Sequence, residues 1–101
     1  MASNVETFNP AYGTGATVAP TASSASSTIN SNTPAVVVTN LSDTIISYVR
    51  IGQGAQTATT ADYPVLPGTQ VSLSKARDDN TVAYITASGT GSLHIITGRG
   101  M

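Results

Sequence analysis

The second part of the chain shows an alternation of apolar and polar residues with a period of two. The clearest case is "TQVSLS" (69–74), where Val71 and Leu73 share one face and the intervening Gln and Ser residues share the other. Successive side chains of a β-strand point to opposite faces of the sheet, so this pattern predicts a half-buried strand. Short β-branched and apolar segments predict four more strands, over residues 35–41, 44–51, 81–87 and 92–97.

The segment 44–51, "TIISYVRI", is apolar on both of its faces. Ile46 and Tyr48 share one face with Arg50, and the other face carries Ile45, Ser47, Val49 and Ile51. We therefore expect one face to pack on the core and the other to be partly covered. From the period-two pattern, the predicted buried residues are Val36, Val38, Ile46, Val49, Val71, Leu73, Val82, Tyr84, Ile85, Leu93 and Ile95.

The connections between these segments contain typical turn residues. "KARDDN" (75–80) predicts a polar turn, because Asp and Asn readily hydrogen-bond to their own backbone. "SGTG" (88–91) predicts a tight hairpin between the last two strands, and "TATTA" (57–61) predicts a short edge strand. Short strands separated by a turn about every ten residues are typical of an all-β fold, here a small antiparallel β-sandwich or barrel.

Residues 1–33 show no such pattern. The segment holds one charged residue, Glu6, and a run of small residues, "TASSASST", that can neither build a core nor sustain a helix. We therefore predict an extended, low-complexity N-terminal arm (1–33) that precedes a β domain (34–101). Neighbouring chains would have to order such an arm, and its two aromatic residues, Phe8 and Tyr12, are the expected partner-binding anchors.

The composition supports the all-β prediction and suggests association with other chains. Ser and Thr account for 28 of the 101 residues, whereas Glu and Lys occur once each. Thr favours strands, and Ser favours turns and irregular backbone. A core built from about 68 residues is marginal for independent stability, so oligomerisation or docking on a larger body would strengthen it.

The charge pattern limits the classes of partner. The net charge is −1, and the basic residues are Arg50, Lys75, Arg77 and Arg99. Nucleic-acid-binding surfaces need clustered basic residues, so we expect no direct nucleic-acid partner. No apolar run approaches the ~18 residues of a membrane span, and we expect no membrane partner. The first residues lack the basic and apolar regions of a signal peptide, which favours synthesis in the host cytoplasm without export by that route.

Candidate catalytic and metal-binding residues are few. His94 is the one histidine and lies in a predicted strand between Leu93 and Ile95, so we expect a surface or interface residue rather than a catalytic base. Asp78 and Asp79 do not begin a calcium loop, because no Glu follows at the required spacing. The chain has no Cys and no Trp. We therefore expect no catalytic residue, no cofactor, no metal and no small-molecule substrate, and hence no enzymatic activity.

Two further patterns are weak. The remaining carboxylates are Glu6, Asp43 and Asp62, and none follows an aromatic segment that could line a hydrolytic cleft. Asn40, Leu41 and Ser42 match the N-glycosylation acceptor pattern, which is common by chance.

The region from Val49 to Met101 resembles small proteins encoded in the structural gene clusters of tailed bacteriophages. In those proteins, as here, an Arg-containing strand precedes "ATTAD-P", and "PG" then leads into an alternating strand. They close with the pattern "A-ITASGTG-L-IT-G-G", which matches residues 83–100 of this chain. The resemblance covers about half of the chain and leaves residues 1–33 uncovered.

The resemblance implies a component of the virion, in the first place a capsid decoration (cement) protein that binds and stabilises the major capsid shell. Such proteins are small, all-β, free of cofactors and often trimeric, so the implied partners are the major capsid protein and neighbouring copies of the chain. The implied location is the capsid surface.

Two other classes of function remain open on the residues. A tail- or fibre-associated module that binds a host surface or carbohydrate would use a polar, aromatic patch formed by Arg50, Tyr63 and His94. A small hydrolase would need a pair of carboxylates in one cleft.

Overall fold

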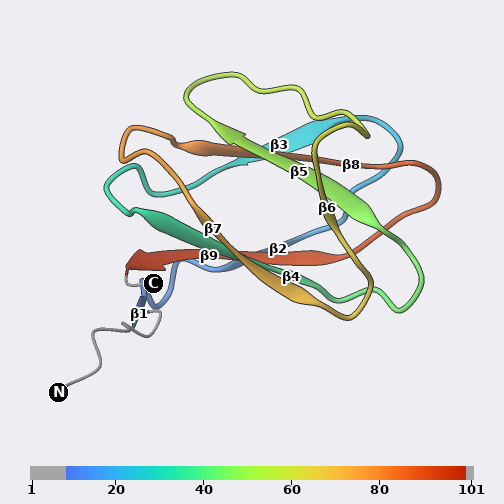
Figure 1. Cartoon of the computed structure of the whole chain (residues 1–101), viewed down its shortest axis with the longest axis horizontal. Coiled ribbons are helices and arrows are strands. Elements are labelled where there is room, and N and C mark those ends of the chain that lie inside the picture. Colours follow the sequence, from blue (N-terminus) through green and yellow to red (C-terminus); the bar gives the residue numbers. More distant parts are fainter. Residues whose placement is uncertain (1–8, 100–101) are drawn as a thin grey trace, which may run out of the picture.

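The computed structural model describes residues 9–99, which form two antiparallel β-sheets packed face to face (Figure 1). The strands are β1 (Asn9–Pro10), β2 (Ala16–Val18), β3 (Ala25–Thr28), β4 (Ala35–Asn40), β5 (Ser47–Gly52), β6 (Tyr63–Val65), β7 (Gln70–Ser74), β8 (Thr81–Thr86) and β9 (Leu93–Arg99). The predicted all-β fold is confirmed, and of the two predicted forms, sandwich or barrel, it is the sandwich. Within residues 9–99 there is no helix, and hence none that could cross a membrane.

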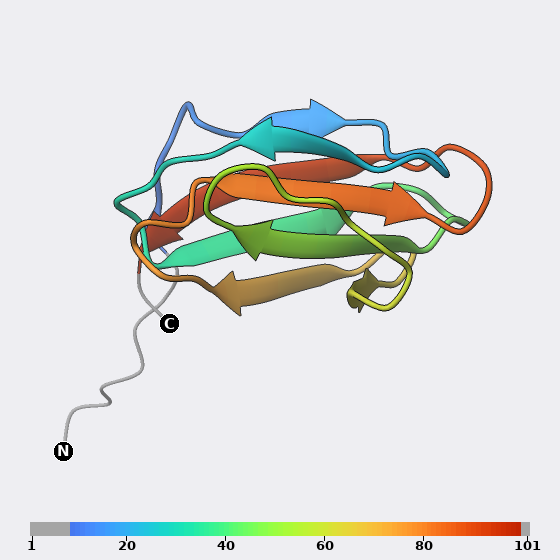
Figure 2. The ribbon, with the colours of Figure 1, turned by 90° about the horizontal axis from the view of Figure 1, so that it is seen from above.

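Strands that follow one another along the chain mostly belong to different sheets. Sheet A has the order β1-β9-β4-β7, with β2 also paired to β9, and sheet B has the order β3-β8-β5-β6. Figure 2 looks down on the two layers and shows β6 and β7 on one side of the sandwich and β2 and β3 on the other. Most connections therefore cross from one sheet to the other.

The prediction of a hairpin at "SGTG" is wrong for this reason. β8 pairs with β3 and β5 in sheet B, whereas β9 pairs with β4 in sheet A. Both strands bury one apolar face, and they do so from opposite sheets, so the connection spans the sandwich instead of closing a hairpin. Gly89 does adopt the positive φ expected of this turn, at 78°.

The core lies between the inner faces of the two sheets. Eight buried side chains form it: Val36, Val38, Val49, Val65, Val82, Tyr84, Leu93 and Ile95. Seven of the predicted buried residues are among them, and Val71 and Leu73 pack against this cluster while remaining partly exposed on the edge strand β7. Ile85 is half-buried. The prediction for Ile46 is wrong: it is 37% exposed, because the other face of its segment, with Ser47 and Val49, faces the core.

The N-terminal segment is extended, as predicted, but its described residues belong to the sheets. β2 pairs with β9 in the register Thr17↔His94, and β3 pairs with β8 in the register Ser26↔Ala83. Main-chain hydrogen bonds order these strands, while few of their side chains are buried. Val18 and Ile29 are the ones that pack against the core. The expected separation between an arm and a β domain at residue 33 is therefore not seen among residues 9–99.

The two predicted anchors have different outcomes. Tyr12 lies in the turn between β1 and β2, next to Gly13 with its φ of 85°, and is 83% exposed. Phe8 lies outside the described residues. The partner-binding role of both residues stays a prediction.

The predicted edge strand "TATTA" (57–61) lies in a loop. The edge strand of sheet B is instead β6, which begins two residues later and contains Pro64. A turn precedes it, because the Thr59 backbone N–H donates to Asp62 Oδ2 at 2.8 Å and the Asp62 N–H to the Thr59 carbonyl at 3.1 Å.

Candidate binding surface

The loop between β5 and β6, residues 53–62, runs over the outer face of sheet B and covers part of it (Figure 1). The Ala58 backbone N–H donates to Ser24 Oγ at 2.8 Å, and the Ala58 side chain is buried. Arg50 holds the other end of the loop, where its Nε and Nη2 donate to Asp62 Oδ1 at 3.1 and 3.0 Å. This ion pair is partly exposed, so we assign it a positioning role and only a small contribution to stability.

Apolar residues occupy the uncovered part of the same face. They form two rows across the strands, of which the first is Pro64, Tyr48 and Ile85. The second row follows when the register of the pairs Ser47↔Val65 and Ser47↔Thr86 is continued by one residue; it consists of Leu66, Ile46 and Ala87. Because Ser47 and Val49 point into the core, these neighbours point outward.

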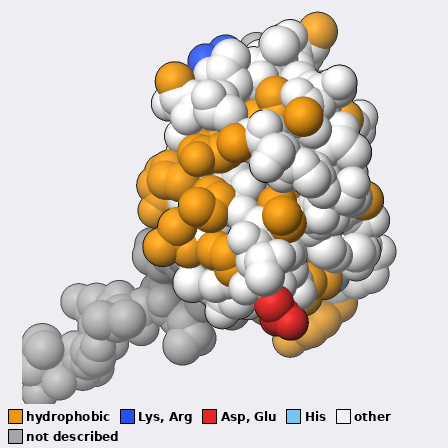
Figure 3. Space-filling model, turned by 90° about the vertical axis from the view of Figure 1, so that its right-hand side faces the viewer, with side chains coloured by type: hydrophobic (Ala, Val, Ile, Leu, Met, Phe, Trp, Pro, Cys, Tyr) orange, Lys and Arg blue, Asp and Glu red, His pale blue; other side chains and the backbone are white. Residues whose placement is uncertain are grey.

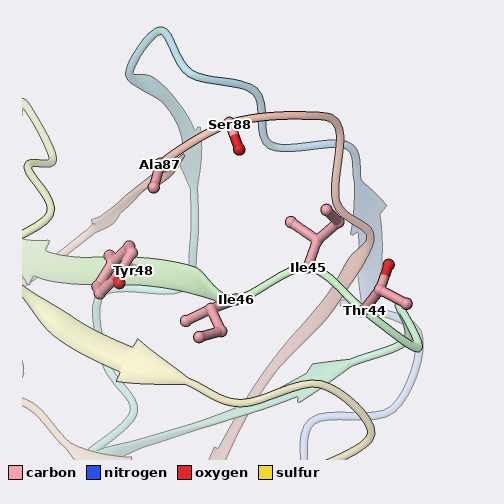
Figure 4. A pocket seen from close by; sticks show the side chains of 6 residues that line it. All are labelled: Thr44, Ile45, Ile46, Tyr48, Ala87 and Ser88. Carbon is pink, nitrogen blue, oxygen red and sulfur yellow. The ribbon is translucent and has the colours of Figure 1, made fainter.

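A hollow of about 200 Å³ lies where these rows meet the connections. Its lining residues are Thr44, Ile45, Ile46, Tyr48, Ala87 and Ser88. Figure 4 shows Ile46 and Tyr48 rising from the β5 segment on one wall and Ala87 and Ser88 from the end of β8 on the other. Four of the six lining residues are aliphatic or aromatic, and Thr44 and Ser88 add polar groups, so this hollow suits an apolar side chain of a partner protein with a hydrogen-bonding group beside it.

We name the surface around this hollow the apolar end; it comprises Leu41, Ile45, Ile46, Tyr48, Leu66 and Ala87. Leu41 and Leu66 are each more than half exposed, at 52% and 53%. Hydrogen bonds from the Asn40 N–H to the Thr69 carbonyl and from the Gly68 N–H to the Ser42 carbonyl hold their two connections together. Figure 3 views the molecule from this end and shows hydrophobic side chains gathered along one side of it.

Asn40 organises the apolar end from below. Its side chain is buried, at 1% exposure, and Nδ2 donates to the carbonyls of Ile45 and Val65, both at 2.9 Å. Oδ1 accepts the Ser42 backbone N–H, also at 2.9 Å. One amide thus joins the end of β4, the 41–46 connection and β6. Because its Nδ2 is buried and hydrogen-bonded, Asn40 cannot be glycosylated in the folded chain.

The residues of the predicted host-binding patch do not come together. Arg50 faces outward from sheet B, and Tyr63 lies at the edge of that sheet, opposite Val49. His94 lies in sheet A, on the outer face, because its neighbours Leu93 and Ile95 point into the core. The thickness of the sandwich therefore separates His94 from Arg50.

The polar turn after β7 is confirmed as a self-bonded turn. Asp79 Oδ2 accepts the Ala76 N–H at 3.1 Å, and the Asp79 N–H donates to the Ala76 carbonyl at 3.0 Å. Asn80 Oδ1 accepts the Gly54 N–H at 3.0 Å and so links this turn to the loop that covers sheet B. Within the described part of the chain, no group of three or more His, Cys, Asp or Glu residues could hold a metal ion.

The apolar end was not identified from the sequence as a site. One signal was available, because the segment 44–51 is apolar on both faces and only one face of a strand in a two-layer sandwich can face the core. The contributions of Leu41 and Leu66 had no signal, because Leu41 ends a predicted strand and Leu66 lies with Val65 between two prolines.

No protein-family model matches the chain, and no curated protein matches it. One similar solved structure comes from Bacillus endospore appendages, described as a novel family of disulfide-linked pili. It is 17% identical, with a TM-score of 0.45, and the match covers 100% of this chain and 95% of that one.

Proposed function

We propose that this protein is a bacteriophage virion structural protein, a capsid decoration protein that binds and stabilises the major capsid shell. The phage resemblance of residues 49–101 motivates the proposal. The main structural support for the proposal is the apolar end, an exposed apolar surface on a domain in which only 9% of residues are charged. Exposed apolar surfaces of this kind mark protein-binding sites.

The surface has the form expected of a contact with another protein. Its centre is the hollow beside Ile46 and Tyr48, and the lining of this hollow also contains Thr44 and Ser88, whose hydroxyl groups can hydrogen-bond to a partner. The nearest acidic residue along the chain is Asp43, and a net charge of −1 provides little electrostatic steering. Affinity must therefore come from apolar contact area. Many copies bound to one shell would together stabilise it even if each copy binds weakly.

A binding assay with purified heads of the phage that encodes the chain tests the proposal. Leu41→Glu places a charge on an exposed side chain of the apolar end and leaves the core unchanged, so we expect it to lower the occupancy of the heads at least about tenfold. Thr57→Glu is the matched control, because Thr57 is also exposed but lies in the loop that covers the other part of sheet B. We expect it to bind like the unmodified chain.

Two results would contradict the proposal. Heads that do not bind the unmodified chain would exclude shell binding. Equal binding of the Leu41→Glu and Thr57→Glu variants would mean that the contact with the shell lies outside the apolar end. If the chain instead binds host cells and not heads, the host-recognition module is the correct class.

A further inference from the structure

β7 is an edge strand whose outer side is unpaired within residues 9–99. It ends the strand order of sheet A, and its single partner is β4, in the register Val37↔Ser72. At five residues it is the longest of the strands that end a sheet order. Its sequence, "QVSLS", contains no charged residue and no proline.

The hydrogen bonds to β4 show which groups of β7 face outward. The Lys75 N–H donates to the Pro34 carbonyl, and the Thr69 carbonyl accepts the Asn40 N–H, so the odd-numbered residues of this strand bond to β4. Antiparallel pairing alternates between residues that bond to the neighbour and residues that do not. The N–H and C=O groups of Gln70, Ser72 and Ser74 consequently point away from β4 and form a free ladder.

The other edges are less suited to pairing. β6 has three residues, and its Pro64 has no N–H to donate. β2 also has three residues, and β3 has four. Natural proteins blunt exposed edges with charge, proline or short length, and β7 has none of these features.

The β7 sequence is complementary to itself in antiparallel orientation. When two copies pair about Ser72, Gln70 of one copy lies opposite Ser74 of the other on the outer face. On the core side, Val71 lies opposite Leu73, so apolar residues meet apolar residues and polar residues meet polar residues. Both core-side residues are already partly buried against the core and would become more so.

Tyr63 provides a second contact on the same side of the sandwich. It lies opposite the buried Val49, on the inner face of sheet B, yet it is 49% exposed. Figure 2 shows β6 and β7 on the same side of the sandwich, and Figure 1 draws β6 above β7. The Tyr63 ring is thus at the rim between the two sheets, where a second copy paired with β7 would cover it.

The geometry points to a two-fold homodimer in which the β7 strands of two copies pair antiparallel about Ser72 and form one continuous sheet. A five-residue strand is about 17 Å long, and the shortest extent of the molecule is 25 Å. The contact would bury roughly 800 Å² in total, less than stable complexes bury, so the dimer is weak and needs a high protein concentration. This inference is independent of the proposed shell binding.

Sedimentation equilibrium from about 10 μM to about 1 mM tests the dimer. We expect the unmodified chain to shift from monomer towards dimer as its concentration rises. Ser72→Lys and Ser72→Glu each place like charges opposite one another, so each variant alone should stay monomeric. An equimolar mixture should recover the dimer, because Lys then lies opposite Glu. Ser26→Lys, which changes an exposed Ser of the edge strand β3, is the matched control and should dimerise like the unmodified chain.

Amide hydrogen exchange provides a readout specific to strand pairing. The amides of Gln70, Ser72 and Ser74 should exchange more slowly as the protein concentration rises, whereas those of Val71 and Leu73, already bonded to β4, should not change. A monomer at every concentration would overturn the inference. A trimer would also do so, as would a dimer that the Ser72 variants leave intact or one that Ser26→Lys abolishes.

Discussion

Asn40→Ala should destabilise the protein more than its small change in volume suggests. The substitution removes three hydrogen bonds of 2.9 Å, to Ile45, Val65 and Ser42. The bond to the Val65 carbonyl is buried, and its loss costs about 1–1.5 kcal/mol, because this carbonyl keeps its place opposite Ser47 in the β5–β6 ladder. The other two bonds are part-buried and contribute about 0.5–1.5 kcal/mol each. The expected loss is therefore about 3 kcal/mol, a large share of the 5–15 kcal/mol that is typical of a small domain.

Urea denaturation followed by circular dichroism measures this loss directly. Ser47→Ala is the matched control, because it also changes a fully buried polar residue to Ala, but the Ser47 hydroxyl has no hydrogen-bond partner among residues 9–99. We expect this variant to be as stable as the unmodified chain or up to about 1 kcal/mol more stable. If Asn40→Ala stays within about 1 kcal/mol of the unmodified chain, the side chain does not hold the apolar end together.

Three further predictions concern other parts of the fold. Asp62→Ala should release the loop over sheet B, with faster amide exchange at Ala58 and a loss of only about 1 kcal/mol in a urea melt. Removing residues 1–33 should cost at least about 4 kcal/mol in a urea melt, because Val18 and Ile29 no longer pack against the core and β9 and β8 each lose a partner. Burial lowers the pKa of Lys75 below 10.5, against the opposing charges of Asp79 and Asp78. The unfolded chain then binds this proton more tightly, so its contribution to stability rises with pH just below 10.5, and urea midpoints should show that Lys75→Met abolishes this rise.

The strands of the second part of the chain could be predicted because they bury one face. Val36, Val38, Leu93 and Ile95 alternate with outward residues, and this alternation survives in the core. Their partners could not be predicted in the same way. The period-two pattern shows which residues point inward, but it does not show which sheet a strand joins. The sequence therefore predicts a hairpin between the segments of β8 and β9, whereas these strands lie in opposite sheets.

The N-terminal strands could not be predicted, because hydrogen bonds rather than side chains position them. β3 consists of Ala, Ser and Thr, and it pairs with β8 through a register of four residues. Such a segment has no periodic apolar pattern, and its composition is that of a disordered tail. The isolated Val18 and Ile29 were the available signal, since each packs against the core from an otherwise polar stretch.

Asn40 shows the same limit for the candidate site. The sequence identifies it as the first residue of an acceptor triplet, and nothing in its neighbourhood indicates that its amide bonds to residues 5 and 25 positions further along the chain. Contacts between connections arise only once the sheets have assembled. The apolar end depends on such contacts, because the β4–β5, β6–β7 and β8–β9 connections come together to form it at one end of the sandwich (Figure 1).

Quantitative mass spectrometry of purified virions tests the proposed function most directly. A decoration protein covers the shell, so its copy number should be comparable with that of the major capsid protein, and it should remain with the heads when the tails are removed. A protein that is absent from the particle, or present in a few copies that leave with the tails, would contradict the proposal.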